Sequence, residues 1–249
     1  MVQGIMSATQ GLPLANFITA FDQSNISGKV IVMILVLGSI VAWSTMLYKY
    51  IHLRSVKERC ERFLKEYHSA EHPAALFNKV QANRHNDTPV REIYFKSCKV
   101  LGGILDASDQ SSVDLFSSPR VPRVNVSDRM VEAVRSAADR SVATEVLLLE
   151  NGMDVLAIAG SAAPFMGLLG TVLGVMNSFE NMGGASAALL SEVAPGISAA
   201  LLTTVVGLIV ALPSSIGYNL LSSRVRHLTV MMDNFAQELI SDIERMYIS

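Results

Sequence analysis

Three stretches without any charged residue dominate the pattern of hydrophobic and polar positions. They cover residues 30–48, 155–179 and 193–223, and each consists almost entirely of apolar and small residues. A helix needs about 20 mostly apolar residues to cross the roughly 30 Å hydrocarbon core of a bilayer. The pattern therefore predicts an all-α, polytopic membrane protein. We assign its three transmembrane helices to residues 29–49, 153–179 and 193–223.

The segment between the first two spans, residues 50–152, mixes charged and apolar residues. This pattern predicts helices that lie outside the bilayer, in contact with water. Helical periodicity covers residues 54–67 and 90–105, and it returns at Asp128, where Ser127 can cap the helix. One face of this last helix is apolar: Met130, Val134, Ala137 or Ala138, Val142, Val146 and Leu149.

Only Gly152 interrupts the pattern between Asp128 and the second span. Spans one and two are therefore expected to continue beyond the membrane as long helices. The tail, residues 224–249, predicts one more amphipathic helix. Its apolar stripe comprises Val225, Leu228, Met232, Phe235, Leu239 and Ile243.

Two segments show weaker patterns. Residues 106–128 are rich in Ser, Asp and Pro and predict a flexible loop. Residues 1–28 predict a short amphipathic helix on the outer membrane surface, with a poorly ordered tail as the alternative. We interpret the first span as a retained helix rather than a secretory signal, because no positive segment precedes it. The apolar face of the N-terminal segment would comprise Leu12, Leu14, Phe17, Ile18 and Phe21.

Basic residues predict the orientation in the membrane, since they concentrate in cytoplasmic segments. The turn at residues 180–192 contains Glu180 and Glu192 and no basic residue. We therefore expect residues 1–28 and 180–192 on the outer side of the membrane, and residues 50–152 and 224–249 on the cytoplasmic side. The basic residues that follow the first and third spans are Lys49, Arg54, Lys57, Arg59, Arg62, Arg224 and Arg226.

The amino-acid composition agrees with a membrane protein and does not indicate a nucleic-acid partner. Half of the residues are hydrophobic, 17% are charged, and the mean hydropathy is +0.37. The formal net charge of −2 does not indicate a nucleic-acid partner. Cys60 and Cys98 lie far apart in the sequence and are expected to be reduced thiols.

Small residues recur along the second and third spans at helical spacing. In a membrane, small residues let two helix backbones approach closely, and this packing drives helix association. Two prolines accompany them in span three: Pro195 suits a first helical turn, whereas Pro213 should kink the helix or be supported by its neighbours. The glycines predicted to pack helices are Gly160, Gly167, Gly170, Gly174 and Gly207.

Hydroxyl groups are the main polar side chains within these spans. A hydroxyl can hydrogen-bond a carboxylate that is losing its proton and can relay protons through water. The alternative is that each hydroxyl bonds the backbone of its own helix. The candidate pore-lining residues are Thr171, Thr204, Thr203, Ser198 and Ser178.

Two motifs resemble the MotA/TolQ/ExbB proton channel family. Residues 163–176, A-P-F-M-G-L-L-G-T-V-L-G-V-M, resemble its second-span signature. Residues 193–197, V-A-P-G-I, together with Thr204, Gly207 and Pro213, resemble its third-span signature. The number of spans and the length are similar to the ExbB/TolQ branch.

The resemblance implies a function and partners. Such subunits form a ring, a pentamer, in the bacterial inner membrane, around a dimer of single-span proteins of the ExbD/TolR kind. Proton flow through an aspartate of the partner would drive a transducer of the TonB/TolA kind. Thr171 and Thr204 match the threonines that line the family's pore. The ion is expected to be H⁺, with Na⁺ as the alternative. Beyond membrane lipids, no cofactor, nucleic acid or enzymatic activity is implied.

One residue departs from the family pattern. Ala199 stands where these proteins usually have a glutamate in the third span. No other carboxylate lies within a span, so a partner should supply the titratable group. The alternative is a scaffold subunit that kept the fold without conducting ions.

A short histidine motif offers a competing interpretation. His68, Glu71 and His72 match the H-x-x-E-H pattern of a family of zinc peptidases. Pro73 follows at once and no further ligand is evident, so we predict no metal site and no enzyme.

Overall fold

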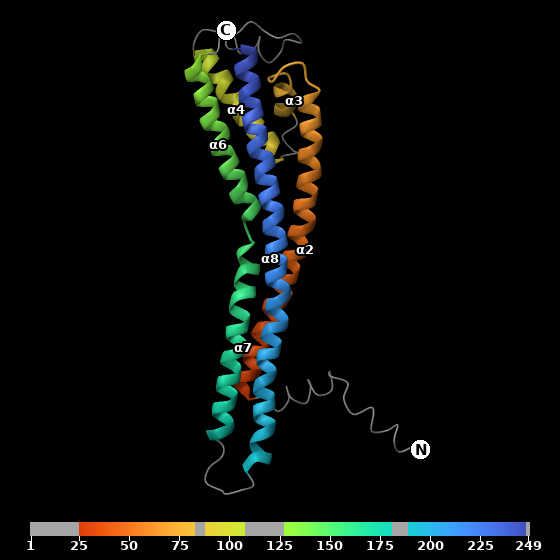
Figure 1. Cartoon of the computed structure of the whole chain (residues 1–249), viewed down its shortest axis with the longest axis vertical. Coiled ribbons are helices and arrows are strands. Elements are labelled where there is room, and N and C mark those ends of the chain that lie inside the picture. The colour runs from red at the N-terminus through yellow and green to blue at the C-terminus, as the bar shows by residue number, and fades with distance from the viewer. Residues whose placement is uncertain (1–24, 83–87, 108–126, 181–188, 248–249) are drawn as a thin grey trace, which may run out of the picture. The chain divides into compact units, whose positions relative to one another are not determined.

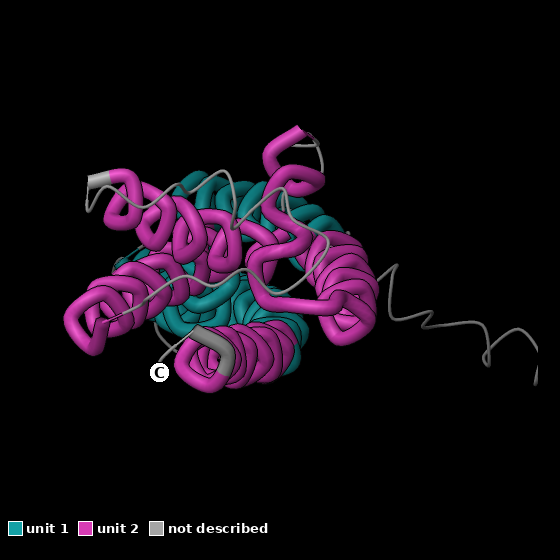
Figure 2. The backbone as a smooth tube through the Cα atoms, turned by 90° about the horizontal axis from the view of Figure 1, so that it is seen from above, with its two compact units in different colours: residues 1–48, 152–220 teal, residues 49–151, 221–249 magenta. Residues whose placement is uncertain are grey.

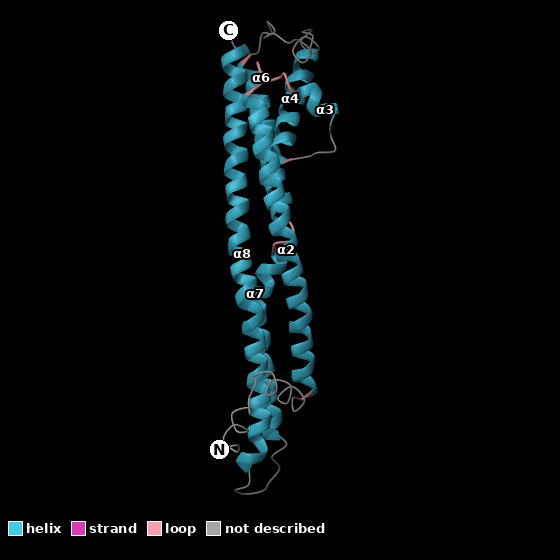
Figure 3. Cartoon of the chain, turned by 90° about the vertical axis from the view of Figure 1, so that its right-hand side faces the viewer, coloured by secondary structure: helices cyan, strands magenta, loops and turns pink. Residues whose placement is uncertain are grey.

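The computed structural model describes residues 25–82, 88–107, 127–180 and 189–247, and every element within these ranges is a helix (Figures 1 and 3). The predicted all-α class is therefore confirmed. Three of the helices are long and apolar enough to cross a membrane, namely α2, α7 and α8. The helices are α2 (Ile26–His68), α3 (Phe77–Ala82), α4 (Pro89–Ala107), α6 (Asp128–Glu150), α7 (Asp154–Glu180) and α8 (Leu189–Tyr247).

The chain divides into two compact units, coloured separately in Figure 2. Unit 1 comprises residues 1–48 and 152–220, and unit 2 comprises residues 49–151 and 221–249. Unit 1 contains α7 and the apolar parts of α2 and α8, whereas unit 2 contains the charged parts of α2 and α8 with α3, α4 and α6. The continuous helix α2 confirms that the first span extends beyond its apolar stretch.

The core of unit 1 joins its three helices. Ile31, Val32 and Leu35 of α2 are buried in one cluster, together with α7 and α8 residues. Many other apolar side chains of these helices are exposed, as expected where a helix faces lipid or another membrane helix. The members that α7 and α8 contribute are Ala163, Val206, Val210 and Ala211.

The core of unit 2 is aromatic. Phe63 and Tyr67 of α2 meet the ring of Phe235 on α8 edge to face, with ring centroids 6.1 and 5.1 Å apart. Phe63 also meets Tyr94 of α4 at 5.6 Å. The predicted stripe of the tail is confirmed, because all six of its residues are buried: Val225, Leu228, Met232, Phe235, Leu239 and Ile243.

The expected continuity between the Asp128 helix and the second span is wrong. Helix α6 ends at Glu150, and α7 begins only at Asp154. Gly152 between them has φ 79°, a left-handed conformation that a residue with a side chain adopts only with strain. Gly152 therefore breaks the helix rather than being tolerated within it.

Two smaller predictions are also corrected. Helix α6 begins at Asp128 as expected, but the Ser127 side chain makes no capping hydrogen bond. The Ser127 carbonyl instead accepts hydrogen bonds from Met130 and Val131. Pro195 is not in a first helical turn, because α8 already begins at Leu189.

Several predictions lie outside the described residues. These are the N-terminal amphipathic helix, most of the loop at residues 106–128 and the greater part of the turn at residues 180–192.

Candidate functional site

Helices α7 and α8 pack through small residues. A methyl group at Gly174 would lie 2.6 Å from Cβ of Ala200, and one at Gly170 would lie 2.5 Å from Oγ1 of Thr203. Both distances are shorter than real carbon contacts, so these positions have no room for a side chain. The pairing shows why the second span needs glycine at helical spacing.

The other predicted glycines continue the same interface. Gly207 of α8 packs on the backbone of Ala163 and Gly167, and Gly160 lies near Ser215. Contacts move backward along α8 as they move forward along α7, so the two helices are antiparallel in unit 1. Five predicted packing glycines therefore lie at one helix interface: Gly160, Gly167, Gly170, Gly174 and Gly207.

Three threonines meet within this interface. Oγ1 of Thr171 lies 2.5 Å from Oγ1 of Thr204 and 3.4 Å from Oγ1 of Thr203. Because Thr171 belongs to α7 and the other two belong to α8, the hydroxyls link the two helices. Hydroxyl groups held this close form one hydrogen-bonded group rather than three separate polar points.

Two backbone carbonyls accept hydrogen bonds from the threonine group. The Thr203 hydroxyl lies 2.9 Å from the Gly167 carbonyl oxygen and 2.7 Å from that of Ala200. Thr171 lies 3.2 and 3.1 Å from the same two oxygens. Each hydroxyl has a single proton to donate, so these contacts alternate rather than coexist. A helix carbonyl oxygen can accept a second hydrogen bond in addition to the one from its own helix. The threonine hydroxyls therefore have acceptors here that carry no net charge.

The three hydroxyls differ in their surroundings. Thr203 is 1% exposed and bonds across the interface, whereas Thr171 and Thr204 are half-buried. In the isolated chain, Thr171 and Thr204 therefore retain access from outside the helix pair. Thr203 has the environment of a packing residue.

The remaining predicted polar residues do not join this group. The Ser178 hydroxyl donates to the Gly174 carbonyl oxygen of its own helix at 2.8 Å, and Ser178 packs against Gly196. Ser198 is exposed, as is Pro195, whereas Pro213 is half-buried. Ser178 thus follows the alternative interpretation, in which a hydroxyl bonds its own helix backbone.

Ala199 is 2% exposed and lies among the buried residues of unit 1. No Asp, Glu, Lys, Arg or His occurs in residues 155–179 or 193–223. The described helices of unit 1 therefore offer hydroxyls and carbonyls at the candidate site, but no group that titrates.

The histidine motif lies in unit 2, whereas the threonine group lies in unit 1. Nε2 of His68 lies 2.7 Å from Oε1 of Glu238 on α8, and His72 is buried. Within the described ranges, no three His, Cys, Asp or Glu residues are grouped so that they could hold a metal ion.

Sequence reasoning missed two contributors to the site. The backbone carbonyl oxygens of Gly167 and Ala200 accept the threonine hydrogen bonds, and neither residue type indicates this role. The only available signal was the spacing of Gly167 four residues before Thr171, the distance at which a threonine bonds its own helix.

The fold and the threonine site together define an all-helical membrane protein with a polar group between its second and third apolar helices. The model of the MotA/TolQ/ExbB proton channel family matches residues 106–234, more than half of the chain. The chain belongs to this family.

Individual relatives agree with this assignment. The chain is 27% identical over 230 residues to the Tol-Pal system protein TolQ of Haemophilus influenzae, covering 92% of this chain and 94% of that protein. It is 29% identical over 224 residues to TolQ of Pseudomonas aeruginosa, covering 90% of both. It is also 26% identical over 220 residues to the biopolymer transport protein ExbB of Salmonella typhimurium, covering 88% of this chain and 83% of that protein.

Proposed function

We propose that this chain is the ring-forming subunit of an ion-driven motor in the bacterial inner membrane. The observation that carries the proposal is the threonine group of Thr171, Thr203 and Thr204, in a chain of the proton channel family. Five copies would surround two single-span partner helices of the ExbD/TolR kind. The work would pass to a periplasmic transducer of the TonB or TolA kind.

Thr171 and Thr204 would line the ion path, because they keep access from outside the helix pair. A hydroxyl can donate to a carboxylate and can accept from a water molecule, so this pair suits a carboxylate that alternates between two protonation states. Ser198 is exposed and could line the ion path together with Thr171 and Thr204. Thr203 and Ser178 would instead hold the helices in position.

The titrating carboxylate would come from the partner, because residues 155–179 and 193–223 contain no Asp or Glu. An aspartate in the partner's single span would face the Thr171 and Thr204 hydroxyls and exchange H⁺. One proton that crosses 100 mV releases about 2.3 kcal/mol, which is enough to bias the motion of a loosely held core helix. Na⁺ is the alternative ion, since hydroxyl and carbonyl oxygens also suit a hard cation.

Assembly is the first test. The full chain is co-expressed with a single-span protein that has an intramembrane aspartate, and the purified complex is weighed by native mass spectrometry. A mass that fits five copies with two partners supports the motor. A ring that never retains the partner contradicts it, because no carboxylate would then lie in the path.

Ion flux is the second test. In liposomes that contain the complex, Thr171→Val and Thr204→Val are each expected to lower proton flux at least tenfold while the assembly mass is unchanged. The size follows from losing one charge-assisted hydrogen bond to the carboxylate, which is typically worth about 1.5–3 kcal/mol. The matched control is Thr229→Val, since Thr229 of α8 bonds its own helix in unit 2, at Val225.

The alternative is a non-conducting scaffold subunit with the same fold. Ala199 favours it, because the resemblance to the family implies a glutamate at this position of the third span and this chain has none. A scaffold predicts that both valine variants leave the function of the complex intact, which is the opposite of the motor's expectation.

A further inference from the structure

Three arginines surround a small cavity in unit 2. Arg59 and Arg62 come from α2, and Arg91 comes from the first turn of α4. The cavity has a volume of about 230 Å³, below the roughly 300–1,000 Å³ of pockets that hold whole drug-sized ligands. Its other lining residues are Phe63, Glu66 and Thr88.

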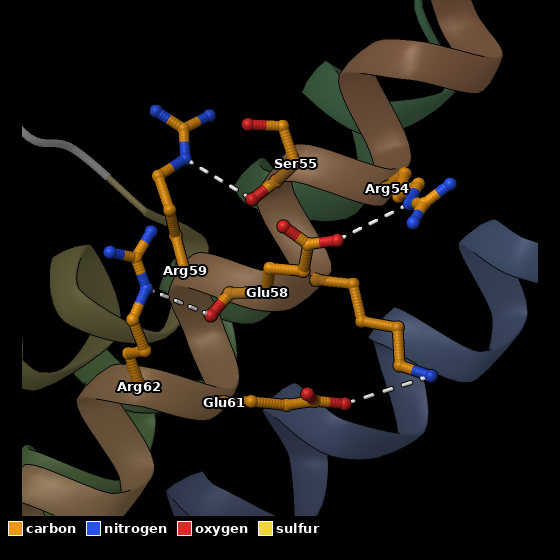
Figure 4. A network of polar contacts seen from close by, with 7 residues as sticks. Arg54, Ser55, Glu58, Arg59, Glu61 and Arg62 are labelled. Carbon is orange, nitrogen blue, oxygen red and sulfur yellow. Dashed lines mark hydrogen bonds and ion pairs between the residues drawn. The ribbon is translucent and has the colours of Figure 1, made fainter.

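The guanidinium groups of Arg59 and Arg62 have N–H donors that are not used in hydrogen bonds to the described residues. Nε of Arg59 donates to the Ser55 carbonyl oxygen and Nε of Arg62 donates to that of Glu58, each at 3.3 Å. Figure 4 shows both guanidinium groups on the same side of α2, whereas Arg54 lies on the other side with the Glu58 carboxylate. These contacts leave the terminal NH₂ groups of Arg59 and Arg62 without a hydrogen bond in the part of the chain that the structure describes.

Charge in the cavity is positive. Glu66 is the one carboxylate in the lining, and it forms an ion pair with Lys79. Arg91 donates through Nη2 to the Lys79 carbonyl oxygen at 3.4 Å. Among the described residues, none of the three arginines forms an ion pair with a carboxylate at this cavity.

Two buried polar atoms here have no partner within the described ranges. Thr88 is 4% exposed, and its Oγ1 makes no hydrogen bond. Nε of Arg91 is likewise buried and unpaired. Buried polar groups are nearly always hydrogen-bonded, because leaving one unsatisfied is costly. A ligand that accepts from both would remove this cost.

Thr88 precedes α4, a helix of 19 residues. The amino end of a helix carries a partial positive charge and presents backbone N–H groups, which suits an anion. The Val90 amide lies beside the Cys60 thiol, where it opposes the rise in that thiol's pKa caused by burial. The arginines and the Thr88 hydroxyl therefore supply most of the donors, and the helix end adds to the field.

We propose that this cavity binds a phosphate group, held by Arg59, Arg62 and Arg91 with the Thr88 hydroxyl. Guanidinium groups bind phosphate through paired N–H donors, and a small cavity admits the phosphate without requiring a larger ligand. The phosphate would belong either to a soluble phosphate compound or to the headgroup of an anionic lipid. The site does not depend on the proposed motor function, because it uses only residues of unit 2.

The test uses the full chain in lipid nanodiscs and has two arms. In nanodiscs of neutral phosphatidylcholine, inorganic phosphate replaces chloride at constant ionic strength while the Tm is followed. In nanodiscs with phosphatidylglycerol, native mass spectrometry counts the lipids that the released chain retains. A saturable rise of the Tm in the first arm identifies a soluble phosphate. An extra retained phosphatidylglycerol in the second arm, without that rise, identifies a lipid headgroup.

Variants connect either signal to the cavity. Arg59→Gln with Arg62→Gln is expected to weaken phosphate binding at least tenfold, or to remove the extra lipid. Thr88→Val keeps the shape of the buried side chain and is expected to weaken the same signal while leaving the ligand-free chain folded. Arg54→Gln is the control, because it removes one arginine charge from the other side of α2.

Three outcomes would overturn the site: no signal in either arm, a signal that the double variant leaves unchanged, or an equal loss in Arg54→Gln. The last would indicate general attraction of anions by the charged part of α2.

Discussion

Thr203 and Thr204 are neighbours in the sequence, yet the structure gives them different environments. Consecutive helical residues point about 100° apart, so one turns into the interface and the other toward its edge. Thr203 is buried and donates to the Gly167 carbonyl oxygen, whereas Thr204 is half-buried and lies 2.5 Å from Thr171. Residue type alone could not separate them, because both are threonines in the same apolar stretch.

Cys98 provides a residue-scale prediction. Burial raises the pKa of the Cys98 thiol to about 12, and the Tyr94 hydroxyl beside it opposes this shift in part. The thiol therefore stays protonated when folded, and protonated thiols do not react with alkylating agents. At pH 8 the native chain should resist iodoacetamide at Cys98 and react only after unfolding, as followed by mass spectrometry.

The control is Ser127→Cys, since position 127 is exposed and should react at once.

The same shift in the pKa of Cys98 makes the stability of the fold depend on pH. The raised pKa means that the unfolded chain loses this proton first, so the Cys98 contribution to stability is complete below about pH 9 and is lost as the pH rises toward 12. Native labelling of Cys98 as fast as that of the control would contradict its burial.

At the scale of elements, glycine has two different tasks in this chain. Gly152 allows a backbone conformation with φ 79° and thereby separates α6 from α7. The glycines of α7 and α8 instead clear space for another helix. A pattern of small residues at helical spacing predicted the second task, because packing repeats along the helix. The first task depends on a single backbone angle and has no such repeat.

The packing glycines lead to an element-scale prediction. A methyl group at Gly207 would lie 2.6 Å from the Ala163 carbonyl oxygen, so Gly207→Ala must push α7 and α8 apart. We expect it to destabilise unit 1 by about 1–3 kcal/mol, the usual cost of overpacking. Unfolding by SDS in maltoside micelles, followed by circular dichroism, measures the change.

The matched control is Gly38→Ala in α2, where a methyl group would meet no atom within 4 Å. It should leave stability unchanged or raise it slightly, since alanine favours helix more than glycine. Equal effects of the two variants would mean that the close α7–α8 contact is not formed.

At the scale of the whole molecule, the remaining prediction concerns the sides of the membrane. The basic residues after the first and third apolar stretches predict that unit 2 lies in the cytoplasm and that the start of α2 and the end of α7 face outward. This orientation would direct the proposed transducer toward the periplasm. It also determines which compartment supplies the phosphate group at Arg59, Arg62 and Arg91.

Single cysteines test the orientation. Glu180→Cys, at the end of α7, and Arg129→Cys, in α6, both replace exposed residues. In intact cells whose outer membrane has been made permeable, a charged maleimide should label position 180 alone. Position 129 should react only after the inner membrane is opened. The reverse pattern would contradict the predicted topology, and the buried Cys60 and Cys98 give a low background.

Much of the fold was predictable from sequence because its signals are local. An apolar run of sufficient length is a membrane span whatever surrounds it, since the cost of leaving charge in hydrocarbon applies to each segment separately. The stripe that includes Met232 and Phe235 was predictable for a similar reason, because helical spacing alone brings its residues to one face.

The tertiary structure alone decided which groups meet. Arg91 joins Arg59 and Arg62 because α4 packs beside α2, and no local pattern connects them. The Gly167 and Ala200 carbonyls join the threonines because small side chains let α7 and α8 approach. The sequence by itself determined the helices, their apolar lengths and the polar residue types within them. The sites depend on contacts between distant segments, and these form only when the helices pack.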